Sequence, residues 1–180
     1  MRKVLLFICS SFPAIISLAQ PGTLDTTFNH TGKVITTLPD SGIIRALAIQ
    51  ADGKIIAAGS KYNGSMHNFA LIRYNTAGTL DSSFGINGIV ITAINNADDI
   101  NAVILQKDEK IIVAGSSYNG SIHAFALARY NNDGSLDASF GKAHTGIDTN
   151  SFGGFNSEAY DWRCKRMQRL LSGVKVVMPK

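Results

Sequence analysis

Acidic and basic side chains recur in this sequence at fixed spacing, and such groups are candidates for acid–base catalysis or for anion binding. Asp25, Asp81 and Asp137 each follow a leucine and precede a phenylalanine by three residues. Arg73 and Arg129 recur in the motif F-A-L-x-R-Y. An acid and a base that meet in a site form a catalytic pair, whereas a half-buried ion pair holds neighbouring elements together. Repetition in every copy favours the structural role.

Metal binding is the second chemistry to consider. His67 and His123 occupy equivalent positions, but zinc needs three or four converging ligands, and no Cys, His or Glu cluster accompanies them. A calcium loop would use Asn131, Asp133, Ser135 and Asp137. The first copy lacks the middle carboxylate, and no Glu follows at the EF-hand position, so turn chemistry explains this run better. We assign no catalytic, cofactor-binding or metal site.

These residues recur because the sequence itself repeats. Leu24, Leu80 and Leu136 lie 56 residues apart, and residues 24–79 align with 80–135 without a gap at 29 identical positions of 56. A fixed period of this order is typical of solenoids and propellers. A third, partial unit covers residues 136–160. The phenylalanines that end the recurring L-D-x-x-F motif are Phe28, Phe84 and Phe140.

The repeat has a specific pattern. It runs A-L-A-I-Q-A-D-G-K-I-I-A-A-G, then F-A-L-I-R-Y-N, then G-(T/S)-L-D-(S/A)-S-F-G. This pattern resembles the delta-60 repeat of secreted bacterial proteins, which is regarded as a β-propeller unit of unknown function. The resemblance covers roughly residues 22–160. It implies a β-propeller architecture and a secreted setting, and it supplies no active site.

Each unit predicts four short strands separated by turns. Asp52-Gly53 and Asn63-Gly64 are hairpin and turn signals, since Gly and Asn accept positive φ. Glu109 replaces the first of these glycines in the second unit, so we expect a different turn type there. The predicted strands are residues 33–38, 44–50, 54–60 and 68–75, then 89–94, 100–106, 110–116 and 124–131.

The predicted fold class is all-β. We expect residues 30–75 and 86–131 to form two adjacent four-stranded antiparallel sheets within a β-propeller-type array of about two and a half blades. Closing a propeller takes about four to eight blades, so the array is an incomplete propeller. A β-helix and a single sandwich are the alternatives that the pattern leaves open.

Residues 1–19 are predicted to be a signal peptide. Arg2 and Lys3 precede a mainly apolar segment, and small residues before Gln20 suit cleavage. The apolar segment is too short, and too interrupted by Ser and Pro, to span a membrane. The expected location is therefore secreted, at the cell surface or periplasmic. Cys9 lies in the leader and Cys164 in the tail, so no disulfide holds the repeats.

The net charge of +4 comes from the two ends of the chain. The leader contributes +2 and residues 161–180 contribute +5, whereas residues 20–160 hold nine Lys and Arg against twelve Asp and Glu, which gives −3. The repeat body is therefore mildly acidic. Only the basic leader and tail would favour binding to nucleic acid, and we expect no nucleic-acid partner.

The functional expectation is an exported repeat module with a binding or cell-surface structural role, without enzymatic activity. Its partner is unknown, with an extracellular protein or a glycan as the expected class. The alternative is a fragment of a propeller hydrolase or lyase whose catalytic residues lie in blades outside this sequence. Differences between the units, such as Ala57 against Val113 and Met66 against Ile122, are chemically mild, which favours the module.

Residues 161–180 are predicted to be a frameshifted end of the third unit. With codon choices that the genetic code permits, the tail read in a frame displaced by two bases becomes L-A-L-Q-A-D-A-K-I-I-V-G-G-K-G-G-N-A-K. Its first 13 positions match residues 47–59 at nine places. We expect the downstream DNA to encode further F-A-L-x-R-Y-N units in that frame. Resequencing the locus tests this, and downstream DNA without such units would make the tail the native end.

Overall fold

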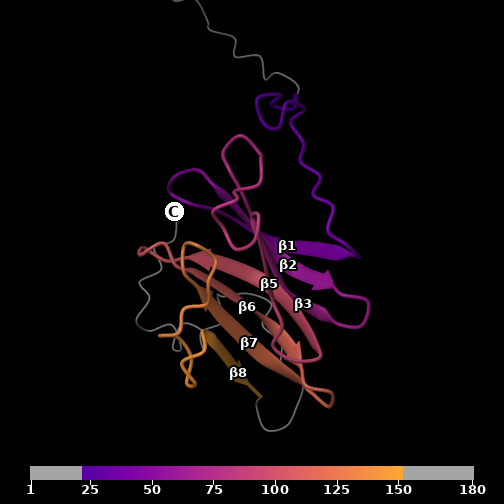
Figure 1. Cartoon of the computed structure of the whole chain (residues 1–180), viewed down its shortest axis with the longest axis vertical. Coiled ribbons are helices and arrows are strands. Elements are labelled where there is room, and N and C mark those ends of the chain that lie inside the picture. Colours follow the sequence, from indigo (N-terminus) through magenta and orange to yellow (C-terminus); the bar gives the residue numbers. More distant parts are fainter. Residues whose placement is uncertain (1–21, 152–180) are drawn as a thin grey trace, which may run out of the picture.

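The chain forms two four-stranded antiparallel sheets, which lie one after the other along the molecule (Figure 1). The computed structural model describes residues 22–151, and every regular element in that range is a strand. The strand orders are β1-β2-β3-β4 and β5-β6-β7-β8. The strands are β1 (Gly42–Ile49), β2 (Ile55–Tyr62), β3 (His67–Tyr74), β4 (Ile89–Thr92), β5 (Ala97–Leu105), β6 (Ile111–Tyr118), β7 (His123–Tyr130) and β8 (Ile147–Asn150).

The sheets do not have the boundaries that the sequence predicted. Residues 33–38 form no strand, and β4 pairs with β3 of the preceding unit, with Phe69 opposite Thr92 and Ile72 opposite Ile89. The first sheet therefore spans residues 42–92 and the second 97–150. A period locates equivalent residues but not the start of a sheet, because the L-D-x-x-F loop turns the chain back onto the strand before it. The expected number of four strands in each sheet is confirmed.

The β1–β2 and β5–β6 hairpins close through the same turn, contrary to expectation. The amide of Gln50 donates to Lys54 O and the amide of Gln106 to Lys110 O, both at 2.8 Å. Glu109 takes a φ of +66°, close to the +82° of Gly53. A left-handed conformation is unfavourable for a residue with a Cβ. The Glu109 side chain also accepts a hydrogen bond from the second sheet's β7–β8 loop, and this contact helps to hold the turn.

The core lies between the two sheets. We call the face of each sheet that carries Phe69 or Phe125 its forward face, and the opposite face its rear face. The forward face of the first sheet packs on the rear face of the second, and burial of this apolar surface supplies the main driving force for folding. The largest buried side chains of this core are Ile56, Phe69, Leu71, Phe84, Ile100, Ile111, Val113 and Tyr130.

Each sheet contains a bulge where the first strand crosses a glycine of the second. The register of β1 shifts between Ile44 and Ala46 beside Gly59, and β5 shifts at the same place beside Gly115. A Cβ on Gly115 would lie 1.8 Å from Asp99 O, and one on Gly59 would lie 1.9 Å from Ile43 O. Only glycine lets the bulged strand approach this closely.

We predict that Gly115→Ala destabilises the protein by about 1–3 kcal/mol, because the added methyl must displace a backbone carbonyl. Urea unfolding of the mature chain, followed by circular dichroism, measures the change. Gly22→Ala is the matched control, since nothing lies within 4 Å of a Cβ placed there. Equal unfolding midpoints for the two variants would contradict the packing argument.

Candidate functional site

Asp81 lies at the centre of a charged cluster beside β3. Its Oδ2 accepts a hydrogen bond from Arg73 Nε at 2.8 Å and lies 3.1 Å from Lys54 Nζ. Its Oδ1 accepts from the amide and the hydroxyl of Ser83, at 3.1 and 2.7 Å. The Arg73 guanidinium also covers the ring of Phe84, 4.6 Å from its centroid. Both oxygens of the carboxylate are thus engaged by cations and hydrogen-bond donors.

The same cluster recurs around Asp137 in the second sheet. Arg129 Nε and Lys110 Nζ each lie 2.6 Å from Asp137 Oδ2, and the Ser139 hydroxyl donates to Oδ1 at 2.7 Å. The Arg129 guanidinium lies 4.8 Å from the centroid of Phe140. The serines and lysines of these clusters were not among the residues selected from the sequence, although their repetition at 54/110 and 83/139 marks them.

The electrostatics of the clusters keep both carboxylates charged. Burial alone would raise the pKa of Asp81, but hydrogen bonds from Ser83 and the neighbouring Lys54 and Arg73 hold it well below its ordinary value. Hydrogen bonds from Lys110 and then Ser139 lower the pKa of Asp137 in the same way. A general base needs a pKa near the working pH and access to a substrate proton. These carboxylates instead hold the loops that carry them against the ends of β3 and β7.

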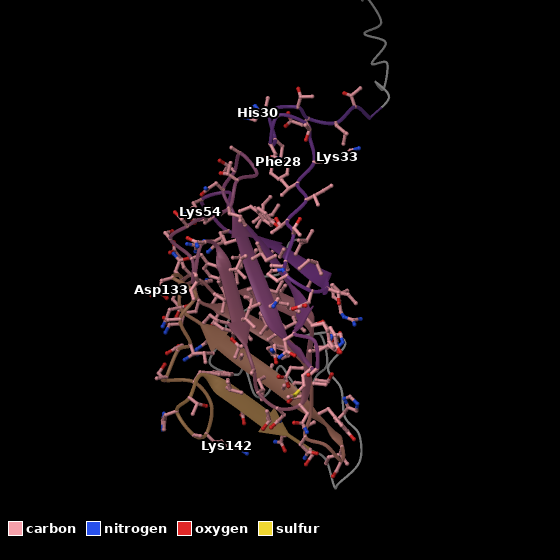
Figure 2. All side chains as sticks on the ribbon, turned by 45° about the vertical axis from the view of Figure 1, so that its right-hand side comes forward. Phe28, His30, Lys33, Lys54, Asp133 and Lys142 are labelled. Carbon is pink, nitrogen blue, oxygen red and sulfur yellow. The ribbon has the colours of Figure 1, made fainter. Side chains whose placement is uncertain are left out.

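Asp25, the first member of the series, has a different environment. It is exposed, and its Oδ1 accepts only from the amide and hydroxyl of Thr27, at 2.9 and 2.6 Å. No arginine pairs with it within residues 22–151. The loop that follows still packs forward on the next unit, because the Asn29 amide donates to Ala77 O at 2.8 Å. Phe28 lies in this loop, near one end of the molecule (Figure 2).

The first cluster also joins the two sheets. Arg73 Nη1 donates to the backbone carbonyl of Asn132 and, at 2.9 Å, to its side-chain oxygen. Gln50 Nε2 donates to the same Asn132 Oδ1, also at 2.9 Å. Asn132 lies in the turn after β7. The arginine that binds Asp81 within its own sheet therefore also positions the neighbouring sheet.

A groove of about 380 Å³ lies between the sheets at the ends of the β1–β2 and β5–β6 hairpins. The Oε1 atoms of Gln50 and Gln106 in this region are buried and have no hydrogen-bond partner. Lys107 and Glu109 occupy the positions where the first unit has Ala51 and Gly53. The groove is lined by Ile49, Gln50, Ala51, Asp52, Leu105, Gln106, Lys107, Glu109 and Asn132.

A second polar group lies between the sheets at Asp99. The Ser60 hydroxyl donates to Asp99 Oδ1 at 2.6 Å, and Arg45 Nη2 and His67 Nδ1 lie 3.6 and 4.0 Å from the same atom. The comparison of the two repeat units in the sequence did not identify the group around Asp99. The signal was present, because Asp99 stands where the first unit has Ile43, and that difference is not chemically mild.

Asp98, the neighbour of Asp99, is completely buried. Its carboxylate accepts hydrogen bonds from the Ile94 amide at 2.7 Å, the Asn95 amide at 3.2 Å and the Ser117 hydroxyl at 2.5 Å. These contacts fix the loop that leads from β4 into β5. Asp98 therefore shapes the connection between the sheets.

The metal-binding candidates do not converge. His67 and His123 lie against Tyr62 and Tyr118 in their own sheets, with ring centroids 5.3 and 4.8 Å apart. Asp133 accepts hydrogen bonds from the amide and hydroxyl of the serine two residues later, which is turn geometry. No group of three or more His, Cys, Asp or Glu is placed to hold a metal among residues 22–151.

Two segments of the chain match a known family model. Residues 50–84 and 106–140 match the family described as a domain of unknown function (DUF5122), beta-propeller. Both segments are thus similar to β-propeller repeats. They start at Gln50 and Gln106 and end at Phe84 and Phe140, so each one covers two strands and the charged cluster. We therefore call the two sheets the first blade and the second blade.

No curated protein matches the chain. No helix that is long and apolar enough to cross a membrane occurs in residues 22–151. The predicted signal peptide and the predicted frameshifted tail lie outside the described residues.

We predict that Asp81→Asn destabilises the fold by about 3–5 kcal/mol, because it leaves the buried Arg73 without its countercharge. Asp25→Asn changes the same motif at an exposed position and is the matched control, with little effect expected. Urea unfolding at pH 7 measures both variants. Equal stability of the two would show that the Arg73–Asp81 ion pair contributes nothing.

The same pair makes the stability depend on pH. The folded-state pKa of Asp81 lies below the unfolded value of about 4, so its contribution is complete above that value and declines as the pH falls towards the folded pKa. We expect the urea concentration at the unfolding midpoint of the native chain to decrease as the pH is lowered below about 5. The decrease is expected to be less steep in Asp81→Asn. An identical acid profile for both proteins would contradict this assignment.

Proposed function

We propose that this chain is an exported β-propeller module that binds an extracellular partner, a glycan or a protein, at the groove between its blades. The observation that supports this proposal is that its polar residues fall into two groups with different contacts. The recurring arginines Arg73 and Arg129, with Asp81 and Asp137, are engaged in the charged clusters, whereas the groove has Lys107 and Glu109, which the first unit lacks. A site that differs between otherwise similar units is where selectivity for a ligand can arise.

The lining of the groove suits a ligand rich in hydroxyl groups. The Oε1 atoms of Gln50 and Gln106 are acceptors without a hydrogen-bond partner, and Asp52 and Glu109 add carboxylates that accept from hydroxyls. Ile49 and Leu105 supply apolar surface for the C–H face of a sugar ring. Such a mixture of apolar surface and a few polar groups is typical of small-molecule and glycan sites.

Binding of the mature full chain to a panel of glycans and extracellular proteins tests this proposal. Lys107→Ala, at the groove, is expected to weaken binding at least tenfold. Lys142→Ala is the matched control, because Lys142 is exposed and lies at the far end of the molecule (Figure 2). If the two variants bind with equal affinity and both have the circular dichroism spectrum of the native protein, the ligand does not bind at the groove.

Export is tested separately. Expression of the complete precursor in a secreting host is expected to give a mature protein that begins at Gln20. N-terminal sequencing of the secreted material provides the measurement. Retention of residues 1–19 on a soluble cytoplasmic product would contradict export and leave the groove proposal to its own test.

The group around Asp99 favours a second candidate, a fragment of a propeller hydrolase or lyase. Asp99 is a carboxylate without a counterpart in the first unit, and it lies close to a hydroxyl, an imidazole and a guanidinium. Ser60 donates to Asp99 and not to His67, so the hydroxyl lacks a histidine base. Turnover of ester, glycoside or uronic-acid substrates that Asp99→Asn abolishes in a folded protein would establish this candidate over the binding module.

A further inference from the structure

The rear face of the first blade is exposed along β1, although the equivalent strand of the second blade is packed. The centre of this face is buried, with Ala57, Ala70 and Ile72 at 4%, 0% and 3% exposure. Leu47 and Ile49 on β1 are 68% and 71% exposed. Their equivalents, Val103 and Leu105, pack into the core against the forward face of the first blade. The two rear faces are built alike, so the internal interface shows what the exposed one is shaped to receive. It fits the forward face of another blade.

The second blade carries such a forward face, in which Ile112, Leu127 and Phe125 are 1%, 2% and 8% exposed. On the two central strands, the forward face of the second blade has the same residues as the forward face of the first, whereas β5 has Ile104 where β1 has Ala48. Within residues 22–151, its cluster is packed only by Ile104 and Phe140 from the same blade and its loop. The matching pairs are Ile56/Ile112, Ala58/Ala114, Phe69/Phe125, Leu71/Leu127 and Arg73/Arg129.

Arg129 supports this assignment. Arg73 reaches Asn132 in the turn of the next blade, whereas Arg129 has no corresponding turn to contact within the described residues. Its side chain is 18% exposed, against 4% for Arg73. In another copy, the backbone carbonyl of Thr76 occupies the position of Asn132. Among the described residues, the Arg129 guanidinium therefore stands where the turn of a following blade would contact it.

Residues 33–36 lie against the first blade in the position that the fourth strand of a preceding blade would occupy. The Thr36 hydroxyl contacts the Tyr74 hydroxyl at 2.6 Å, as Thr92 on β4 contacts Tyr130 of the second blade at 2.9 Å. Ile35 is 89% exposed. Residues 33–36 thus lie against the first blade as β4 lies against the second, without a third strand to pair with in residues 22–151.

The second blade has a fourth strand that fits less well. In β4, Val90 lies opposite Leu71, but in β8 the charged Asp148 lies opposite Leu127. Residues 34–36 read Val-Ile-Thr, identical to residues 90–92 of β4. A charged side chain beside apolar neighbours is less favourable than valine, so Val34 is a better partner for Leu127 than Asp148 is. At the first position of the strand the exchange places Lys33 where β8 has Ile147.

We propose that copies of this chain associate head to tail, with the rear face of the first blade of one copy on the forward face of the second blade of the next. Residues 33–36 replace β8 of the neighbouring copy in this assembly. The contact joins two different surfaces, so it generates a ring or a filament. Two blades per copy give a closed propeller of about four to eight blades from two to four copies. His30 and Lys142, equivalent residues of the first and third units, lie at opposite ends of the molecule, as a head-to-tail contact requires (Figure 2).

Light scattering coupled to size-exclusion chromatography tests the association over a range of concentrations. The mature full chain is expected to show one discrete mass, two to four times that of the monomer. Leu47→Lys is expected to reduce it to the monomer without loss of β-structure, because Leu47 is exposed. Ile86→Lys is the matched control at an 80% exposed position, where the third unit already has Lys142. A monomer at all concentrations, or an oligomer that Leu47→Lys leaves intact, would overturn the proposal.

Disulfide trapping tests the exchange of strands. By the pairing of Ala70 with Ile91, the exchange places Ile35 of one copy opposite Ala126 of the next. Ile35→Cys with Ala126→Cys, in a Cys164→Ser background, is expected to form covalent oligomers on a non-reducing gel. Thr149→Cys with Ala126→Cys reports the unexchanged arrangement, in which Ala126 pairs with Thr149. Efficient closure of this second pair within monomers, with none of the first, would exclude the exchange.

Discussion

The buried ion pair between the arginine of F-A-L-x-R-Y and the aspartate of L-D-x-x-F is the interaction on which the architecture depends. It attaches the loop after β3 to the end of β3, so the chain turns back and β4 pairs with the strand just completed. The same Arg73 reaches the turn of the next blade through Asn132. One guanidinium therefore fixes both the closure of a blade and the position of its neighbour. Its five donors in a rigid fork make arginine suitable for this double contact, which lysine could not provide.

Apolar packing between blades supplies the rest of the stability. The forward face of one blade packs on the rear face of the next, and the glycines at the bulges let the first strand lie close to the second. Without cysteines in the repeats, this contact and the charged clusters carry the fold. A blade face that lacks its neighbour leaves large apolar side chains in water, as at Leu47 and Ile49. The requirement for a covered face makes a propeller blade a poor independent unit, and it explains why such blades occur in arrays.

Function in a repeat protein resides where the units differ. The recurring aspartates and arginines neutralise one another, so their lowered pKa values reflect structure and not catalysis. Three charged residues of the second unit that have uncharged counterparts in the first lie between the blades, Lys107 and Glu109 at the groove and Asp99 beside Ser60. A lowered pKa does not by itself identify a functional residue, since structural ion pairs shift pKa values as active sites do.

The sequence by itself determined the all-β class, the four strands in a sheet and the equivalence of residues 56 apart, because periodicity and turn chemistry are local properties of the chain. It also predicted the pairing of Arg73 with a repeated aspartate. The tertiary structure decided where each blade begins, because a period has no origin until β4 pairs with β3. It also decided that Glu109 keeps the turn of Gly53, since a contact with Asn132 compensates for an unfavourable φ. The meeting of Asp99 with Ser60 likewise depended on packing between residues far apart in sequence, which no local pattern encodes.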